Sequence, residues 1–230
     1  MYSFELAYNK KHIVTYLLIG MTTLVWLLQF FLYGMNVATA QNLLNSGALW
    51  GWQIILHPSE LWRLITPIFV HLSWPHYLMN MFTLFMVGRL VEEEFGSLRY
   101  AEIYLLSGIF ANSFTFFISP NTLAAGASTA IFGIFGAMGT LGFFTGSPRL
   151  KEIGQGFLVL IAINLVLNIF QPGVSIVGHI GGIIGGCLLA GAWPPARYKR
   201  WVPRNVQIIC ASLTVLSFTL FIVLTFARLG

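Results

Sequence analysis

Seven apolar stretches dominate this chain of 230 residues, and each is close to the length that crosses a bilayer as an α-helix. About 20 predominantly apolar residues are needed to span the hydrocarbon core. Only 8% of the residues are charged, whereas a soluble domain carries about a quarter. We therefore predict an all-α polytopic membrane protein. The predicted spans are residues 13–33, 77–93, 101–119, 127–146, 153–171, 174–193 and 206–227.

The basic residues between these spans predict the orientation of the chain. Seven spans place ten of the twelve lysines and arginines on the side of the N-terminus, and only Arg63 and Arg228 on the other side. Because cytoplasmic loops carry the excess of Lys and Arg, we expect a multi-pass protein of the plasma membrane with a cytoplasmic N-terminus and an external C-terminus. The scatter of these residues over short loops argues against a nucleic-acid-binding patch, despite the net charge of +5.

The predicted organisation has three parts. Residues 1–12 form a short cytoplasmic N-terminus, residues 13–200 a transmembrane domain, and residues 201–230 a linker with an extra C-terminal transmembrane helix. The first span is longer than the about 7–15 apolar residues of a signal peptide, so we expect it to be retained. Residues 34–75 form a long external loop that holds four of the seven tryptophans. Indole rings favour the lipid headgroup region, so we expect this loop to lie along the membrane surface.

Four polar side chains are expected at a similar depth in the outer third of the bilayer. Ser128 begins the fourth span, and His179 lies in the first turns of the sixth. His76 and Asn80 open the second span, and their spacing of four residues places them on one face of a helix. All three spans enter the bilayer from the external side in the predicted topology. Because polar groups are costly to bury in lipid, their convergence predicts a functional site.

Glycines repeated at intervals of three and four residues predict that the fourth and sixth spans pack closely. Such packing would bring Ser128 and His179 within the hydrogen-bond distance that a nucleophile needs from its base. Phe132, one turn further along the fourth span, would lie on the same face and brace the imidazole ring. The glycines are Gly133, Gly136, Gly139 and Gly142 in the fourth span, and Gly178, Gly181, Gly182, Gly185 and Gly186 in the sixth.

Simpler roles stay open for individual residues at this stage. Ser128 is also typical of a helix N-cap or a packing position, and Asn80 of a hydrogen bond between helices. His71 and His76 would suit a metal ion, but no HExxH motif accompanies them, so we expect no metal site. The chain has no aspartate, and Glu60 is the only acidic residue on the predicted external side. Serine chemistry would therefore rest on a Ser-His dyad.

Two motifs around these residues resemble those of the rhomboid family of intramembrane serine proteases. Residues 126–128 (Gly-Ala-Ser) are similar to the family's GxSG nucleophile motif, and residues 178–182 (GHIGG) are similar to its GHxxG base motif. The resemblance covers about residues 47–188 and implies a rhomboid-like six-helix bundle. The seventh span is similar to the six-plus-one arrangement of some rhomboids. One departure is Thr129, which stands where the family has a glycine.

Two further motifs strengthen the resemblance. Trp62 and Arg63 match the WR motif of the family's first external loop. His71, His76 and Asn80 match the HxxxxHxxxN pattern that opens the family's second span. Together these motifs are far more specific than the Gly-Ala-Ser sequence alone.

The resemblance implies a serine endopeptidase that cleaves the transmembrane segments of single-span membrane proteins near the outer face of the lipid bilayer, without a cofactor. Ser128 would attack the peptide carbonyl and His179 would act as general base. The Ser128 backbone N–H, His76 and Asn80 would stabilise the oxyanion. Substrate would enter between the second and fifth spans. Residues implied to support the site or the substrate are Gly126, Phe132, His71, Trp62 and Arg63.

Two other functions remain open. A rhomboid-like protein can bind membrane helices without cutting them, and a small transporter would also explain polar residues within the spans. Thr129 bears on the first alternative, because threonine is bulkier than glycine at a close helix contact. We expect its side chain to project towards another helix, where its hydroxyl can bond back to a carbonyl of the preceding turn.

Overall fold

A computed structural model describes residues 12–168 and 175–229 of the chain. Residues 1–11 of the predicted N-terminus lie outside the described residues, as do residues 169–174, where the fifth predicted span ends and the sixth begins. The elements in chain order are α2 (Ile13–Tyr33), η1 (Gly34–Ala38), α3 (Ala40–Asn45), β1 (Leu49–Trp50), α4 (Gly51–Leu56), η2 (Pro58–Leu64), η3 (Thr66–Ile68), α5 (Trp74–Phe95), α6 (Ser97–Ile118), β2 (Leu123–Ala124), α7 (Ser128–Phe144), α8 (Pro148–Asn168), α9 (Ile176–Ala192), η4 (Ala196–Trp201) and α10 (Arg204–Leu229).

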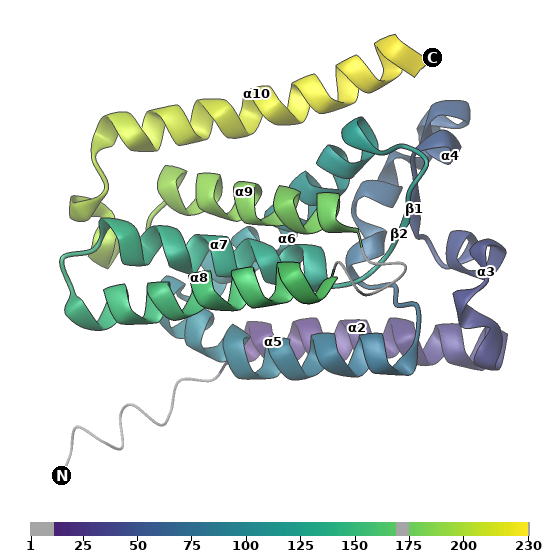
Figure 1. The fold of residues 1–230 in the computed structure, drawn as a ribbon, viewed down its shortest axis with the longest axis horizontal. Helices are drawn as coiled ribbons and strands as arrows, with labels where there is room; N and C mark the ends of the chain where they lie inside the picture. Colours follow the sequence, from purple (N-terminus) through teal and green to yellow (C-terminus); the bar gives the residue numbers. More distant parts are fainter. Residues whose placement is uncertain (1–11, 169–174, 230) are drawn as a thin grey trace.

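A helix carries the described part of each of the seven predicted spans, which confirms the all-α polytopic fold class (Figure 1). The predicted and observed starts differ most at α8, which begins at Pro148 instead of residue 153. Its first turn consists mainly of polar residues, which the apolar pattern leaves out. α5 also begins before its apolar stretch. The Ser73 hydroxyl accepts from the His76 backbone N–H (3.3 Å), and Pro75 occupies the first turn, where its missing N–H costs nothing.

Length and hydropathy alone single out three helices of the described residues as able to cross a membrane: Ile13–Ala38, Ser97–Ile118 and Arg204–Arg228. α7 and α9 are equally apolar but have only 17 residues each, or roughly 25 Å of helix. α7 is buried along almost its whole length. Helices that face mainly protein need not match the full bilayer thickness, which explains why these two are short.

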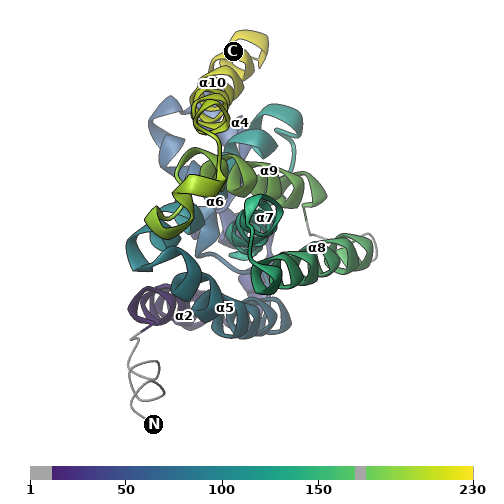
Figure 2. The ribbon, with the colours of Figure 1, turned by 90° about the vertical axis from the view of Figure 1, so that its left-hand side faces the viewer.

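α7 forms the centre of the bundle, with α6, α8 and α9 packed around it (Figure 2). A Cβ added at Gly186 of α9 would overlap the Gly133 carbonyl, and one at Gly182 would overlap the Thr129 carbonyl. This close approach confirms the predicted packing between the fourth and sixth spans. Glycines also allow close packing at two more helix interfaces. Gly181 and Gly185 face α6, and Gly139 and Gly142 face α8.

The loop predicted at residues 34–75 is an ordered cap of short helices and one strand. β1 pairs antiparallel with β2, which directly precedes α7 (Figure 1). Arg63 anchors the cap from within: it is buried, and its Nη1 donates to the carbonyls of Leu44 (2.7 Å) and Ala48 (3.2 Å). The cap therefore connects the first half of the chain to the segment that leads into Ser128.

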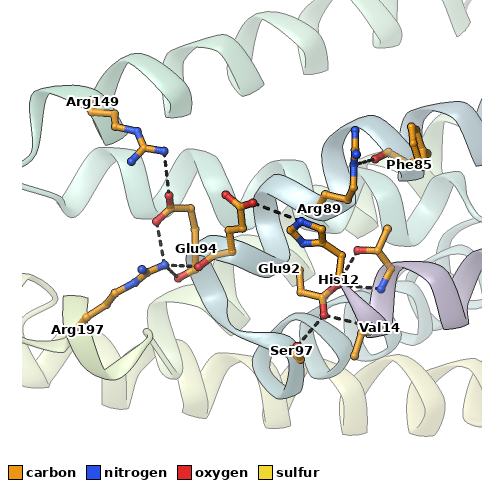
Figure 3. Close-up of polar contacts among 11 residues, drawn as sticks. His12, Val14, Phe85, Arg89, Glu92, Glu94, Ser97, Arg149 and Arg197 are labelled. Carbon is orange, nitrogen blue, oxygen red and sulfur yellow. Dashed lines mark hydrogen bonds and ion pairs between the residues drawn. The ribbon is translucent and has the colours of Figure 1, made fainter. Parts of the chain in front are cut away.

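At the opposite end of the bundle, Glu92 of α5 joins three helices (Figure 3). Its carboxylate accepts from the backbone N–H groups of Val14 (3.1 Å) and Thr15 (2.9 Å), and from the Ser97 hydroxyl (2.6 Å). His12, the N-cap of α2, makes no capping bond with its own side chain. Glu92 therefore replaces the missing N-cap: it accepts from the N–H groups that have no partner within α2, and its negative charge complements the dipole of that helix.

α10, the predicted extra helix, packs along α6 and α9 (Figure 1). The contact with α6 is aromatic: the ring of Phe221 lies 5.4 Å from those of both Phe110 and Phe117, measured between centroids. The side of α10 that faces away from α6 and α9 is rich in exposed apolar residues, as expected for a surface that faces lipid.

Candidate active site

The loop that ends at Ser128 is held by residues far away in the sequence. The Gly126 backbone N–H donates to the Pro67 carbonyl (2.8 Å), and the Ala127 N–H points to Nε2 of His71 (3.5 Å). Gly126 has a φ of +139°, a conformation that residues with a Cβ rarely adopt. The chain then turns into α7, whose first residue is Ser128. These contacts fix both the hydroxyl and the backbone N–H of Ser128.

His71 belongs to this scaffold. Its buried ring places Nδ1 3.2 Å from the Phe69 carbonyl and Nε2 towards the Ala127 N–H, which fits a neutral imidazole protonated at Nδ1. Burial, together with the smaller effect of the nearby His76, lowers the pKa of His71 to about 3. Gln29 of α2 clamps the His71 backbone, accepting from its N–H (3.0 Å) and donating to its carbonyl (3.2 Å). Sequence reasoning did not identify Gln29.

Ser128 and His179 meet across the α7–α9 contact. The Ser128 Oγ lies 2.7 Å from Nε2 of His179, so the predicted hydrogen-bond distance is confirmed. The ring of Phe132 stacks on the imidazole with 4.2 Å between centroids and 18° between planes, as the sequence predicted. His179 is only 3% exposed. A serine hydroxyl and a neighbouring imidazole are therefore held together in a water-poor environment.

A small cavity opens beside this pair, with a volume of about 10 Å³. This volume accommodates about one water molecule. A peptide segment would therefore have to displace neighbouring elements to reach Ser128. The residues around the cavity are His76, Asn112, Ala124, Ala125, Gly126, Ser128, Thr129, Ser175 and His179.

His76 reaches the cavity, whereas Asn80 does not line it. A Cβ added at Gly126 would lie 2.7 Å from Cε1 and 2.9 Å from Nε2 of His76, so the imidazole rests on the glycine next to Ser128. The buried Nδ1 of His76 has no hydrogen-bond partner among the described residues. The Asn80 side chain donates to the His76 carbonyl one turn earlier (3.0 Å). Asn80 thus contacts the predicted oxyanion region only through α5.

Trp62 and Arg63 lie in the cap and do not line the cavity. The Arg63 guanidinium sits over the Trp62 ring, 4.4 Å from its centroid, and donates to the Glu60 carboxylate. Gln53 also donates to Glu60 (3.1 Å). These hydrogen bonds, with that from Arg63 the largest cause, lower the pKa of Glu60. The one acidic residue on the predicted external side is therefore engaged within the cap.

Two residues at the cavity were missed by the sequence. Asn112 on α6 is buried and donates to the Leu64 carbonyl (2.8 Å), which ties the cap to the bundle. Ser175 is the N-cap of α9 and accepts from the Gly178 N–H (3.0 Å), so it positions the turn that carries His179. A buried asparagine in an apolar span was the available signal for Asn112.

Thr129 projects towards α9 as predicted, because a Cβ added at Gly178 would lie 3.1 Å from its Cγ2. The expected hydrogen bond of its hydroxyl is wrong: the Oγ1 is buried and has no partner among the described residues. The reason is its place at the second residue of α7. Four residues back the chain is still in the loop, so no helical carbonyl is presented to the hydroxyl.

The family model for the rhomboid domain matches residues 58–193, which include the cavity, Ser128 and His179. The chain belongs to the rhomboid family. It is 37% identical over 186 residues to Rhomboid protease GluP of Bacillus subtilis, a match that covers 80% of this chain and 35% of that protein. It is 34% identical over 154 residues to RHOMBOID-like protein 7 of Arabidopsis thaliana, covering 66% of this chain and 48% of that protein.

This rhomboid also resembles Rhomboid-like protease 3 of Toxoplasma gondii, with 28% identity over 166 residues, 69% of this chain and 63% of the other. The chain thus spans between about a third and two thirds of the length of these relatives. Two of these three relatives are named as proteases.

Proposed function

We propose that this rhomboid is an intramembrane serine endopeptidase that cleaves transmembrane segments of single-span membrane proteins with a Ser-His dyad. One observation carries the proposal: the 2.7 Å contact between Ser128 Oγ and His179 Nε2, from two helices whose glycines bring them together. A packing serine would have no need of a buried histidine at this distance. The names of two relatives as proteases support the same reaction class.

The proposed reaction proceeds in two steps. Ser128 Oγ bonds to the carbonyl carbon of the scissile peptide while its proton passes to His179 Nε2. The C–N bond then breaks, and the same proton goes to the leaving amine. In the second step a water molecule, deprotonated by His179, attacks the acyl carbon. The bond from that carbon to Ser128 Oγ breaks, and the proton passes from His179 back to Oγ. Phe132 keeps the imidazole in the plane that serves both transfers.

The oxyanion needs donors fixed before the reaction. We assign this role to the backbone N–H of Ser128, at the start of α7, and to Nε2 of His76. Since Nδ1 of His76 is buried without an acceptor among the described residues, the tautomer with its proton on Nε2 avoids burying an unpaired N–H. That tautomer places an N–H beside Gly126, where it could donate to the reacting carbonyl. Asn80 is assigned a positioning role through the His76 carbonyl.

Substrate would enter sideways from the lipid, between α5 and α8. Both helices expose apolar side chains outward, among them Phe82 on α5 and Val159 on α8. Because the cavity holds about one water, entry requires these helices or the cap to separate. No cofactor takes part in the proposed reaction.

We place the chain in the plasma membrane, with its N-terminus in the cytoplasm and the cavity near the external face. Ten of twelve basic residues then lie in cytoplasmic segments. An alkaline phosphatase fusion after residue 171 should be active and one after residue 150 inactive. The reverse pattern would rule out this orientation.

Cleavage of a single-span substrate in liposomes tests the proposed reaction. The wild type should produce two fragments, whereas Ser128→Ala and His179→Ala should produce none. Chelators should leave the rate unchanged. Cleavage by Ser128→Ala would show that another residue, or a contaminant, carries the activity.

A catalytically silent, helix-binding protein is the second candidate, and Thr129 is the observation that favours it. Its unsatisfied hydroxyl lies beside the nucleophile and its methyl contacts the helix that bears His179. If the wild type folds but does not cut, while Thr129→Gly cuts, Thr129 silences the site. We expect both to cut, because the Ser128–His179 contact is present with Thr129 in place.

A further inference from the structure

A second, larger cavity of about 420 Å³ lies at the end of the bundle away from Ser128. It is formed by the start of α6, the end of α9, η4 and the start of α10. Figure 1 shows the end of α9 and the start of α10 on the left, whereas β2, which leads to Ser128, lies on the right. A volume in this range is typical of sites for small molecules.

Three basic side chains line this cavity: Arg99 of α6, Lys199 of η4 and Arg204 of α10. Within the described part of the chain, no acidic residue lines it. The Glu102 carboxylate pairs with Arg99 at 3.1 Å, but both side chains are about 40% exposed, so this pair is weak. Among the described residues, the polar contact of the Arg204 side chain is with the neutral Gln207 amide oxygen, at 3.5 Å. The cavity therefore retains positive charge, which is suited to an anion.

Apart from Gln207, the rest of the lining is apolar, and part of it faces outward. Trp193 is 43% exposed and Ile208 is 54% exposed, so both lie on the surface of the membrane bundle. Tryptophan favours the boundary between headgroups and hydrocarbon. Basic groups next to apolar ones at this boundary fit a ligand that carries both an anionic head and acyl chains.

The position of the basic groups is fixed by neighbouring contacts. Arg197 Nη2 donates to the Glu94 carboxylate (2.9 Å; Figure 3), and the Tyr198 hydroxyl donates to the same group (2.6 Å). η4, which carries Lys199, is thereby held against α5. Gln207 Nε2 donates to the Val202 carbonyl (2.9 Å) and fixes the turn into α10. A site ordered in advance loses little entropy when its ligand binds.

We propose that this cavity binds the phosphate headgroup of an anionic phospholipid. Arg99, Lys199 and Arg204 would contact the phosphate, and the acyl chains would run along Trp193 and Ile208. A bound lipid would connect α10 to α6 and α9 where the three helices meet. Basic pockets between transmembrane helices are suited to such headgroups on the cytoplasmic side. The leaflet rests on the proposed orientation, whereas the binding does not, and neither depends on protease activity.

Native mass spectrometry of the full-length protein in detergent tests the proposal, with dioleoylphosphatidylglycerol and dioleoylphosphatidylcholine as probes. One phosphatidylglycerol should bind per chain, with at least about tenfold higher affinity than phosphatidylcholine. Each basic residue near an anionic headgroup contributes about fivefold. The variant Arg99→Gln/Lys199→Gln/Arg204→Gln should therefore lose the preference. Lys199→Gln alone, at an exposed position, should lower the affinity about fivefold without affecting folding.

A matched control removes the same charge elsewhere. Arg149→Gln/Lys151→Gln/Arg200→Gln changes three basic residues outside the cavity lining, on segments of the same predicted side. This control should keep the preference for phosphatidylglycerol. Equal losses in both triple variants, or equal affinity of the wild type for the two lipids, would overturn the proposal. Inorganic phosphate that displaces the lipid completely at equal concentration would show a site for small anions instead.

Discussion

Gly126 is the residue at which the backbone and the proposed chemistry depend on each other most closely. Its φ of +139° is unfavourable for any residue with a Cβ. An added Cβ would also lie 2.7 Å from Cε1 and 2.9 Å from Nε2 of His76, closer than real Cβ contacts allow. Gly126→Ala must therefore either move His76 or twist the loop that places Ser128.

The two effects have different sizes and different readouts. Backbone strain at such a position costs about 1–3 kcal/mol, which should appear as a loss of unfolding free energy. If His76 swings away, a proposed oxyanion donor is lost, and such a loss costs about 2.7–4 kcal/mol of transition-state stabilisation. The cleavage rate should then fall by about 10²–10³-fold, while the folded protein persists.

Cleavage in liposomes and thermal unfolding measure these effects on the same samples. Gly20→Ala is the matched control, because nothing lies within 4 Å of a Cβ at this position in α2. It should keep the wild-type rate and gain slightly in stability, since alanine favours a helix by about 0.5–1 kcal/mol over glycine. A Gly126→Ala protein that cleaves at the wild-type rate would refute the placement of His76 as an oxyanion donor.

Two smaller predictions follow from buried polar groups. Thr129→Val keeps the methyl contact with Gly178 and removes an unsatisfied hydroxyl. The unfolding free energy should therefore rise by about 1–3 kcal/mol. A decrease would show that the hydroxyl has a partner. The pKa of His71 is lowered to about 3 in the folded protein, so as the pH decreases the unfolded chain binds this proton first. The unfolding free energy should therefore decrease as the pH is lowered from about 6.5, by up to about 1.4 kcal/mol per pH unit. His71→Gln should flatten this slope in thermal unfolding measured against pH, and an unchanged slope would place the titration elsewhere.

The long helices were predictable because the signal that defines them is local. A run of apolar residues of about 20 positions marks a span whatever its neighbours are. The meeting of Ser128 and His179 was also predictable, because the glycines that permit it lie on the same two spans. The stacking of Phe132 follows from its spacing of one helical turn from Ser128.

The cap and the finer contacts of the site could not be predicted in the same way. The cap depends on long-range hydrogen bonds, such as those from Arg63 to the carbonyls of Leu44 and Ala48, that no local pattern encodes. Asn80 shares a helical face with His76, yet its amide turns back to a carbonyl of its own helix. The hydroxyl of Thr129 lacks a partner because α7 begins one residue earlier. Such choices depend on helix ends and on rotamers, which residue spacing does not reveal.

Covalent labelling tests the proposed nucleophile most directly. A fluorophosphonate should react with the purified wild type once per chain, and mass spectrometry of the digested protein should place the adduct on Ser128. Ser128→Ala should not be labelled. His179→Ala should be labelled far more slowly, because Ser128 Oγ then lacks the base that lies 2.7 Å away. A folded wild type that stays unlabelled, or an adduct on any other residue, would contradict the assignment of Ser128 and His179 as a catalytic dyad.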